Sequence, residues 1–90
     1  MKIIKARGFI NSYKRLHKNQ LLDVDNAIRA VADDPSIGDK KMGDLSWLSV
    51  YKFKMVNQLT LLAYTYNGDD IILTLVSVGT HENFYRNLKR

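Results

Sequence analysis

The 90-residue sequence has no cysteine and only one proline. Without cysteine, neither a disulfide nor a thiolate metal site can form, and a reducing cytoplasm suits the chain. The sequence also has no apolar run near the roughly 20 residues that a membrane-spanning helix needs, and no apolar secretion signal at its N-terminus. We therefore expect a cytoplasmic protein without a membrane partner.

Acidic residues are missing from positions 1–18, although these positions carry six cations: Lys2, Lys5, Arg7, Lys14, Arg15 and Lys18. Over the whole chain, 14 Lys and Arg stand against 9 Asp and Glu, giving a net charge of +5 and a pI near 9.6. A domain with such a segregated basic charge favours a polyanionic or acidic partner. A charge that only keeps the protein in solution is the alternative.

The length and the balanced composition, with 46% hydrophobic and 26% charged residues, predict one globular domain over residues 1–90. Apolar residues at helical spacing predict a short helix over about 7–17. A second helix, capped by Asn19, should follow and end near Asp33 and Asp34, because the residue before Pro35 is biased away from helical geometry. Helices separated by so few residues form an antiparallel hairpin.

The hydrophobic period then changes to two, which predicts strands over 49–55, 59–66 and 71–78. We expect turns at Asn57-Gln58 and Asn67-Gly68, the second being a strong hairpin signal. Residues 36–45 form a polar loop, residues 1–5 can add an edge strand, and residues 81–88 form a short C-terminal helix. The expected fold is α+β, with the N-terminal helical hairpin packed on one face of a small antiparallel β-sheet.

Two lysines stand two residues apart on the first of these strands. The alternation gives Tyr51, Phe53 and Met55 to the core and leaves Lys52 and Lys54 together on the opposite face. Paired ammonium groups on a sheet can clamp a phosphate. A strand face exposed to solvent also commonly carries lysine, so an ordinary surface is the alternative.

His81 follows the last strand and is the best candidate for a group that titrates near neutral pH. A purely structural role is also open, in which Thr80 caps the C-terminal helix and His81 lies in its first turn. Of the adjacent Phe84 and Tyr85, one should pack in the core while the other could stack on a base. Arg86 could hold a phosphate.

Other chemistries lack the residues that they need. The carboxylates do not form a two-metal cluster, no histidine pair has metal-ligand spacing, and no glycine-rich phosphate loop or nucleophile elbow is present. What remains is a site for proton transfer that uses neither metal nor cofactor and is built from His, Lys, Arg and Tyr.

The chain resembles the RelE/ParE superfamily of toxins from bacterial type II toxin–antitoxin systems. The resemblance rests on an ordered series of segments: Phe9-x-x-x-Tyr13-Lys14-Arg15-Leu16, Asp34-Pro35-x-x-Gly38, Gly43-Asp44-Leu45, Val50-Tyr51-Lys52-Phe53-Lys54, Leu61-Leu62-Ala63-Tyr64 and Gly79-Thr80-His81-Glu82-Asn83-Phe84-Tyr85. The last segment is similar to the closing motif of the YafQ-like branch. The resemblance implies two helices packed on a small antiparallel sheet.

The resemblance also implies a function. Many relatives are metal-independent endoribonucleases, or mRNA interferases, that cut messenger RNA on the ribosome, whereas the ParE branch inhibits DNA gyrase and cleaves no RNA. By the motif, His81 and Tyr85 correspond to functional residues of the YafQ-like enzymes. Those enzymes carry histidine where this chain has Lys52, so the division between base and acid stays open.

We therefore expect a ribosome-dependent messenger-RNA endoribonuclease that inhibits growth, with a gyrase inhibitor as the alternative and a regulatory module as a third possibility. The expected catalytic residues are His81, Lys52, Lys54 and Tyr85. The expected RNA-binding residues are Arg86, Lys40, Lys41, Lys14 and Arg15. The expected partners are a cognate antitoxin, the ribosome and messenger RNA, or else gyrase.

Overall fold

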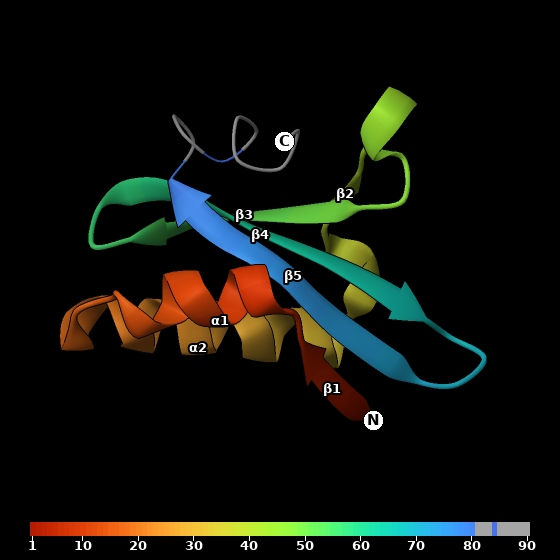
Figure 1. Ribbon diagram of the computed structural model, residues 1–90, viewed down its shortest axis with the longest axis horizontal. Coiled ribbons are helices and arrows are strands. Elements are labelled where there is room, and N and C mark those ends of the chain that lie inside the picture. The colour runs from red at the N-terminus through yellow and green to blue at the C-terminus, as the bar shows by residue number, and fades with distance from the viewer. Residues whose placement is uncertain (81–83, 85–90) are drawn as a thin grey trace.

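The computed structural model describes residues 1–80 and 84 and shows an α+β fold of two helices and a five-stranded sheet (Figure 1). The elements follow in the order β1 (Lys2–Lys5), α1 (Arg7–Lys14), α2 (Lys18–Asp33), η1 (Pro35–Ile37), β2 (Asp39–Lys40), η2 (Gly43–Leu45), β3 (Ser49–Met55), β4 (Gln58–Asn67) and β5 (Ile72–Thr80). The expected class is confirmed. The expected C-terminal helix lies almost wholly outside the described residues and stays a prediction.

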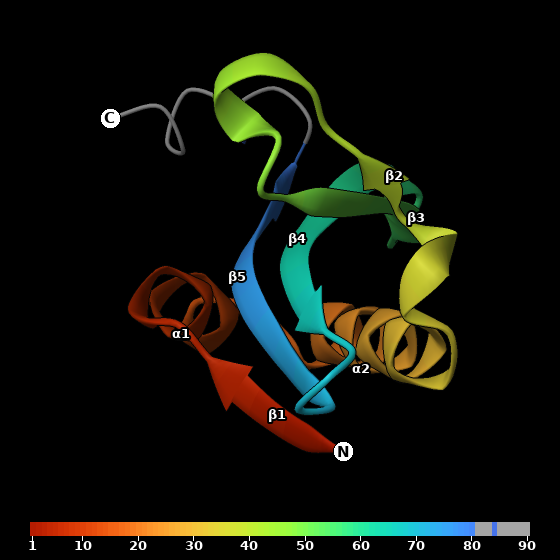
Figure 2. The same cartoon turned by 90° about the vertical axis from the view of Figure 1, so that its right-hand side faces the viewer.

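The sheet has the strand order β1-β5-β4-β3-β2. Strands β3 to β5 pair antiparallel, as expected, and the short β2 adds to β3 in the same sense. The edge strand β1 runs parallel to β5, with Lys2 opposite Ile72 and Lys5 opposite Leu75. The sheet is therefore mixed and not purely antiparallel. Strand β1 is parallel because it leads directly into α1, and α1 packs along β5 (Figure 2).

Both helices cover one face of the sheet and make the larger core with it (Figure 1). Helix α1 contributes the buried Phe9, and α2 contributes an apolar stripe of Val24, Ala27 and Val31 at helical spacing. These side chains pack on buried residues from the sheet: Met55, Leu62, Tyr64, Leu73, Leu75 and Val78. The placement of the helices on one face is confirmed.

The helix boundaries differ from the expectation at two points. Helix α1 ends at Lys14, three residues early, and α2 begins at Lys18 with His17 as its cap, so Asn19 is not the cap. The reason is a local hydrogen bond, in which the backbone N–H of His17 donates to Oε1 of Gln20 at 2.7 Å. The predicted end of α2 before Pro35 is confirmed.

Both hairpin turns also differ from the expectation. The β3–β4 turn is formed by Val56 and Asn57, with φ of +50° and +68°, one residue earlier than expected. Asn67-Gly68 does not form a two-residue turn. The Asn67 side chain instead accepts hydrogen bonds from the backbone N–H groups of Asp69 and Asp70 at 3.0 and 3.2 Å, which builds a longer loop before β5.

A second, smaller core lies on the face of the sheet that is opposite the helices. It contains the buried residues Leu48, Val50, Leu61, Ala63 and Phe84. The segment expected to be a loop, residues 36–45, holds the short strand β2 and two single helical turns, and it leads to Leu48. Val76 also packs on this second core, and a register shift in the pairing of β4 and β5 at Ala63 and Tyr64 then brings Val78 to the helix side with Leu73 and Leu75.

Candidate functional site

Lys52 and Lys54 lie on β3 with their side chains exposed on the face of the sheet opposite the helices. The alternation along β3 explains this, because Tyr51 and Phe53 pack against the helix-side core and Met55 is buried in it. The rings of Tyr51 and Phe53 also stack on each other at a centroid distance of 6.1 Å. The predicted division of this strand into an apolar face and a cationic face is confirmed.

The strand register sets what lies beside the two lysines. Lys52 is opposite Leu61 of β4, which is opposite Gly79 of β5, and Lys54 is opposite Leu59. Residues that lie directly opposite one another on neighbouring strands project on the same face of the sheet. Because neighbouring strands lie about 4.8 Å apart, the backbone of Gly79, two strands away, is about 10 Å from that of Lys52. The C-terminal end of β5 therefore lies two strands away from Lys52, level with it across the sheet.

Phe84 shows where the chain goes beyond β5. Its side chain is buried in the second core with Val50 and Leu61, on the face that carries Lys52. His81 lies between Thr80 and Phe84 in the sequence, but His81, Tyr85 and Arg86 fall outside the described residues. Their catalytic and binding roles stay predictions.

The two lysines have no counter-ion within residues 1–80 and 84: no carboxylate of this part of the chain forms an ion pair with Lys52 or Lys54. Ammonium groups without a counter-ion attract an anion more strongly than paired ones do. In the same part of the chain, no group of three or more His, Asp or Glu side chains is placed to hold a metal ion. None of the helices described there is long and apolar enough to cross a membrane.

The other cations expected to bind RNA lie in two different places. Lys40 is exposed on β2, and Lys41 follows it, half-buried, with its backbone N–H donating to the carbonyl of Leu48 at 3.0 Å. Lys14 and Arg15 are exposed at the end of α1, on the helix side of the sheet. The structure thus places Lys14 and Arg15 on the opposite side of the sheet from Lys52 and Lys54.

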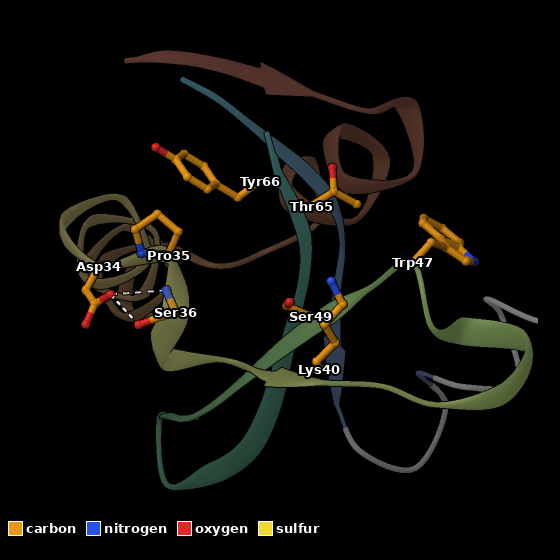
Figure 3. Close-up of a pocket in the computed structure, with 8 residues that line it drawn as sticks. All are labelled: Asp34, Pro35, Ser36, Lys40, Trp47, Ser49, Thr65 and Tyr66. Atoms are coloured by element: carbon orange, nitrogen blue, oxygen red, sulfur yellow. Dashed lines mark hydrogen bonds between the residues drawn. The ribbon is translucent and has the colours of Figure 1, made fainter. Parts of the chain in front are cut away.

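A pocket of about 360 Å³ opens at the end of the sheet that lies away from the β3–β4 turn (Figure 3). Its lining residues come from η1, β2, β3 and β4 and the segments beside them: Asp34, Pro35, Ser36, Lys40, Trp47, Ser49, Thr65 and Tyr66. Apart from Lys40, the sequence did not point to this group, although the single tryptophan just after a polar loop is a usable signal.

Tyr64 fixes the wall of this pocket. Its fully buried side chain reaches η1, where the hydroxyl donates to the carbonyl of Pro35 at 2.6 Å and accepts from the backbone N–H of Gly38 at 2.9 Å. Burial raises the pKa of Tyr64 above its ordinary value, so the hydroxyl stays protonated and able to donate. Next to it, hydrogen bonds from the Ser36 hydroxyl and N–H lower the pKa of Asp34, which stays ionised.

The chain and its fold are similar to known proteins. A family model described as the ParE-like toxin of type II bacterial toxin–antitoxin systems matches residues 3–89. No curated protein matched the sequence significantly.

Among solved structures, a chain of the intact E. coli RelBE toxin–antitoxin complex is 16% identical, with a TM-score of 0.69 over 88% of this chain and 94% of that one. A free-state mutant of the E. coli toxin RelE is 17% identical, with a TM-score of 0.69 over 99% and 95%. A YoeB/ParE toxin from Agrobacterium tumefaciens is 16% identical, with a TM-score of 0.69 over 90% and 99%. At such identities these likenesses concern the fold.

Proposed function

The chain belongs to the ParE-like toxins of type II bacterial toxin–antitoxin systems, and we propose that it acts as a metal-independent endoribonuclease that cuts messenger RNA on the ribosome. The observation that carries this proposal is the pair of exposed lysines on β3, with which no carboxylate of residues 1–80 forms an ion pair. Lys52 and Lys54 lie on the face where Phe84 packs, and His81 precedes Phe84 by three residues in the sequence.

RNA brings its own nucleophile to such a site, so the reaction needs no metal. A base takes the proton of a 2′-hydroxyl, whose oxygen then bonds to the adjacent phosphorus. The bond from phosphorus to the 5′-oxygen breaks, and an acid gives that oxygen a proton, leaving a cyclic phosphate and a 5′-hydroxyl end. His81 serves as one of these two proton carriers.

The lysines act on the charge that develops during this reaction. Two negative oxygens form on the phosphorane, and cations that are already held in place stabilise them without having to reorganise. Lys52 and Lys54 are suited to this task because they project from a regular strand that pairs with β4 and not from a loop. Tyr85 stacks on or orients a base, and Arg86 holds a backbone phosphate.

The test is cleavage of a defined message by purified protein added to programmed ribosomes. His81→Ala and the double variant Lys52→Ala/Lys54→Ala should each lose cleavage by about 100-fold or more, the scale of one proton carrier or one charge-stabilising group. The matched control is Lys2→Ala/Lys5→Ala, which removes two exposed lysines from the edge strand β1 and should cleave normally. Full cleavage by a folded His81→Ala protein would remove that residue from the mechanism.

Gyrase inhibition is the other activity that we expected from the resemblance, and a second assay separates it. Plasmid topology is followed while the toxin is induced, together with a map of cut sites in cellular messages. Cut messages with unchanged supercoiling support the nuclease. Lost supercoiling with intact messages would replace the nuclease by a gyrase inhibitor.

We also propose that a cognate antitoxin binds the toxin. The fold of this chain is similar to that of a chain of the E. coli RelBE toxin–antitoxin complex, which supports this proposal. The net charge of +5, which suits an acidic partner, supports it as well. Binding that covers Lys52 and Lys54 would neutralise the site directly.

A further inference from the structure

The pocket bounded by Trp47 and Tyr66 is separate from the lysine pair on β3. It lies where β3 begins and β4 ends, whereas Lys54 lies near the opposite end of both strands. Ser49 and Lys52 are three residues apart on β3, so their backbones are about 10 Å apart at 3.3 Å per residue. A stacked nucleic-acid strand advances 3.4 Å per nucleotide, so about three nucleotides would span this distance.

The pocket combines exposed aromatic rings with a cation. Trp47 is 53% exposed and Tyr66 is 39% exposed, which are high values for large rings in so small a domain. In Figure 3, Lys40 rises from β2 in the middle of the pocket, between Trp47 on one rim and Tyr66 with Pro35 on the other. Within the described residues no carboxylate forms an ion pair with Lys40.

Polar groups complete the lining. Ser49 lies beside Lys40, Thr65 lies between Tyr66 and Trp47, and the Asp34 carboxylate stands at the wall, held by Ser36. A flat ring with polar edges and an attached phosphate would use all of these groups. An acidic peptide would find only one cation here and would meet the negative charge of Asp34.

Building on the proposed action on RNA, we propose that this pocket binds one unpaired nucleotide of single-stranded RNA, outside the segment that is cut. The base stacks on the ring of Tyr66, as bases do on the aromatic side chains of single-strand-binding proteins, and Trp47 stands on the opposite rim. The ammonium group of Lys40 contacts the phosphate. The hydroxyl groups and the Asp34 carboxylate contact the edges of the base or the ribose.

Trp47 is the one tryptophan of the sequence, so its fluorescence reports directly on this pocket. The whole chain is titrated with a short oligonucleotide of 2′-O-methyl RNA, which has no free 2′-hydroxyl and cannot be cut. We expect saturable quenching. Tyr66→Leu should weaken the binding by roughly 5- to 150-fold, the value of one lost base–aromatic stack, whereas Tyr66→Phe keeps the ring and should bind normally.

Lys40→Gln tests the phosphate contact. It should weaken binding and reduce the slope of log K against log salt by about 0.7, the contribution of one phosphate contact to a single strand. Lys2→Gln removes the same charge from the edge strand β1 and should leave the slope unchanged. Equal effects of the two substitutions would mean that only overall charge matters, and would overturn the pocket.

The result of the fluorescence titration does not depend on whether the protein cuts RNA. Quenching that persists in Lys52→Ala/Lys54→Ala supports the pocket even if no message is ever cut. Cleavage by a wild-type protein whose Trp47 fluorescence does not respond to RNA would overturn the pocket and leave the nuclease intact. Quenching by a polyglutamate peptide but not by RNA would also overturn it, because an acidic protein segment would then be the occupant.

Discussion

Replacing Tyr64 by phenylalanine removes one oxygen atom and should destabilise the protein measurably. The Tyr64 hydroxyl joins β4 to the turn η1, because it donates to the carbonyl of Pro35 and accepts from the backbone N–H of Gly38. The ring of Tyr64 is fully buried, so phenylalanine fills the same space without a cavity. The change therefore isolates the two hydrogen bonds.

The size of the effect follows from those two bonds. Each contributes about 0.5–1.5 kcal/mol net, and an N–H or carbonyl left buried without a partner costs about 1–3 kcal/mol. Because Pro35 and Gly38 are only half-buried, water can reach part of the site, and we expect a total loss of about 2 kcal/mol. For a domain of this size, each 1 kcal/mol lowers Tm by about 4–8 °C, so Tm should fall by about 8–16 °C.

Urea unfolding followed by circular dichroism measures the loss, with an unchanged m value as the sign that only stability has changed. The matched control is Tyr66→Phe, which removes a hydroxyl from the exposed tyrosine two residues along the same strand and should change stability by less than about 0.5 kcal/mol. Equal stability of the two variants would refute the reasoning. Because η1 carries the pocket wall, Tyr64→Phe should also weaken nucleotide binding there, whereas Tyr66→Phe should not.

Two further predictions concern the backbone and pH. Val56 holds a φ of +50°, which is strained for a β-branched residue, so Val56→Asn should stabilise the protein by about 1 kcal/mol in the same urea assay, and a loss of stability would contradict this. The folded-state pKa of Tyr64 is raised by burial, and that of Tyr13 by its hydrogen bond to Asp25, so the unfolded chain loses these protons first. Stability should therefore be retained below pH 10 and should fall as pH rises through the raised values, with a smaller fall in Tyr64→Phe; a flat profile would contradict it.

The features that the sequence predicted well are those in which burial follows a regular period. Tyr51, Phe53 and Met55 alternate with Lys52 and Lys54, and a strand can only satisfy that pattern by giving one set to a core. The same reasoning placed α2, whose apolar residues are spaced for a helix. In both cases the local pattern and the tertiary packing require the same conformation, so sequence alone suffices.

The turns were predicted less well because their conformation depends on a side-chain hydrogen bond or on a contact with a neighbouring element. Asn67-Gly68 favours a two-residue turn, but the Asn67 side chain binds the N–H groups of Asp69 and Asp70 and makes a longer loop. At the other hairpin, Asp23 of α2 accepts a hydrogen bond from the N–H of Val56 at 2.9 Å. A contact across 33 residues leaves no trace in the local sequence, and it helps to hold Val56 in its strained geometry.

The aromatic pocket could not be predicted for a related reason. Lys40, Trp47 and Tyr66 are far apart in the sequence and meet only because β2 pairs with β3 and β3 with β4. Strand β2 has two residues, too few to show any period. The sequence could show that Lys40 is a cation in a polar loop, but only the fold shows that it stands between two exposed rings.

The unequal covering of the sheet explains where function can reside. The helix side is closed by a continuous core, whereas on the opposite side the described residues make a smaller core, in which Leu48 and Phe84 pack with Val50 and Leu61. The lysine pair of β3 projects on that second face, and the aromatic pocket lies at the end of the sheet where β3 begins. Under the proposed function, one strand of RNA would run from the lysine pair to the pocket at the end of the sheet. The cations at the end of α1, which lie on the closed side, would then have to contact a different body, and a toxin that acts on a message held by the ribosome has such a second contact to make.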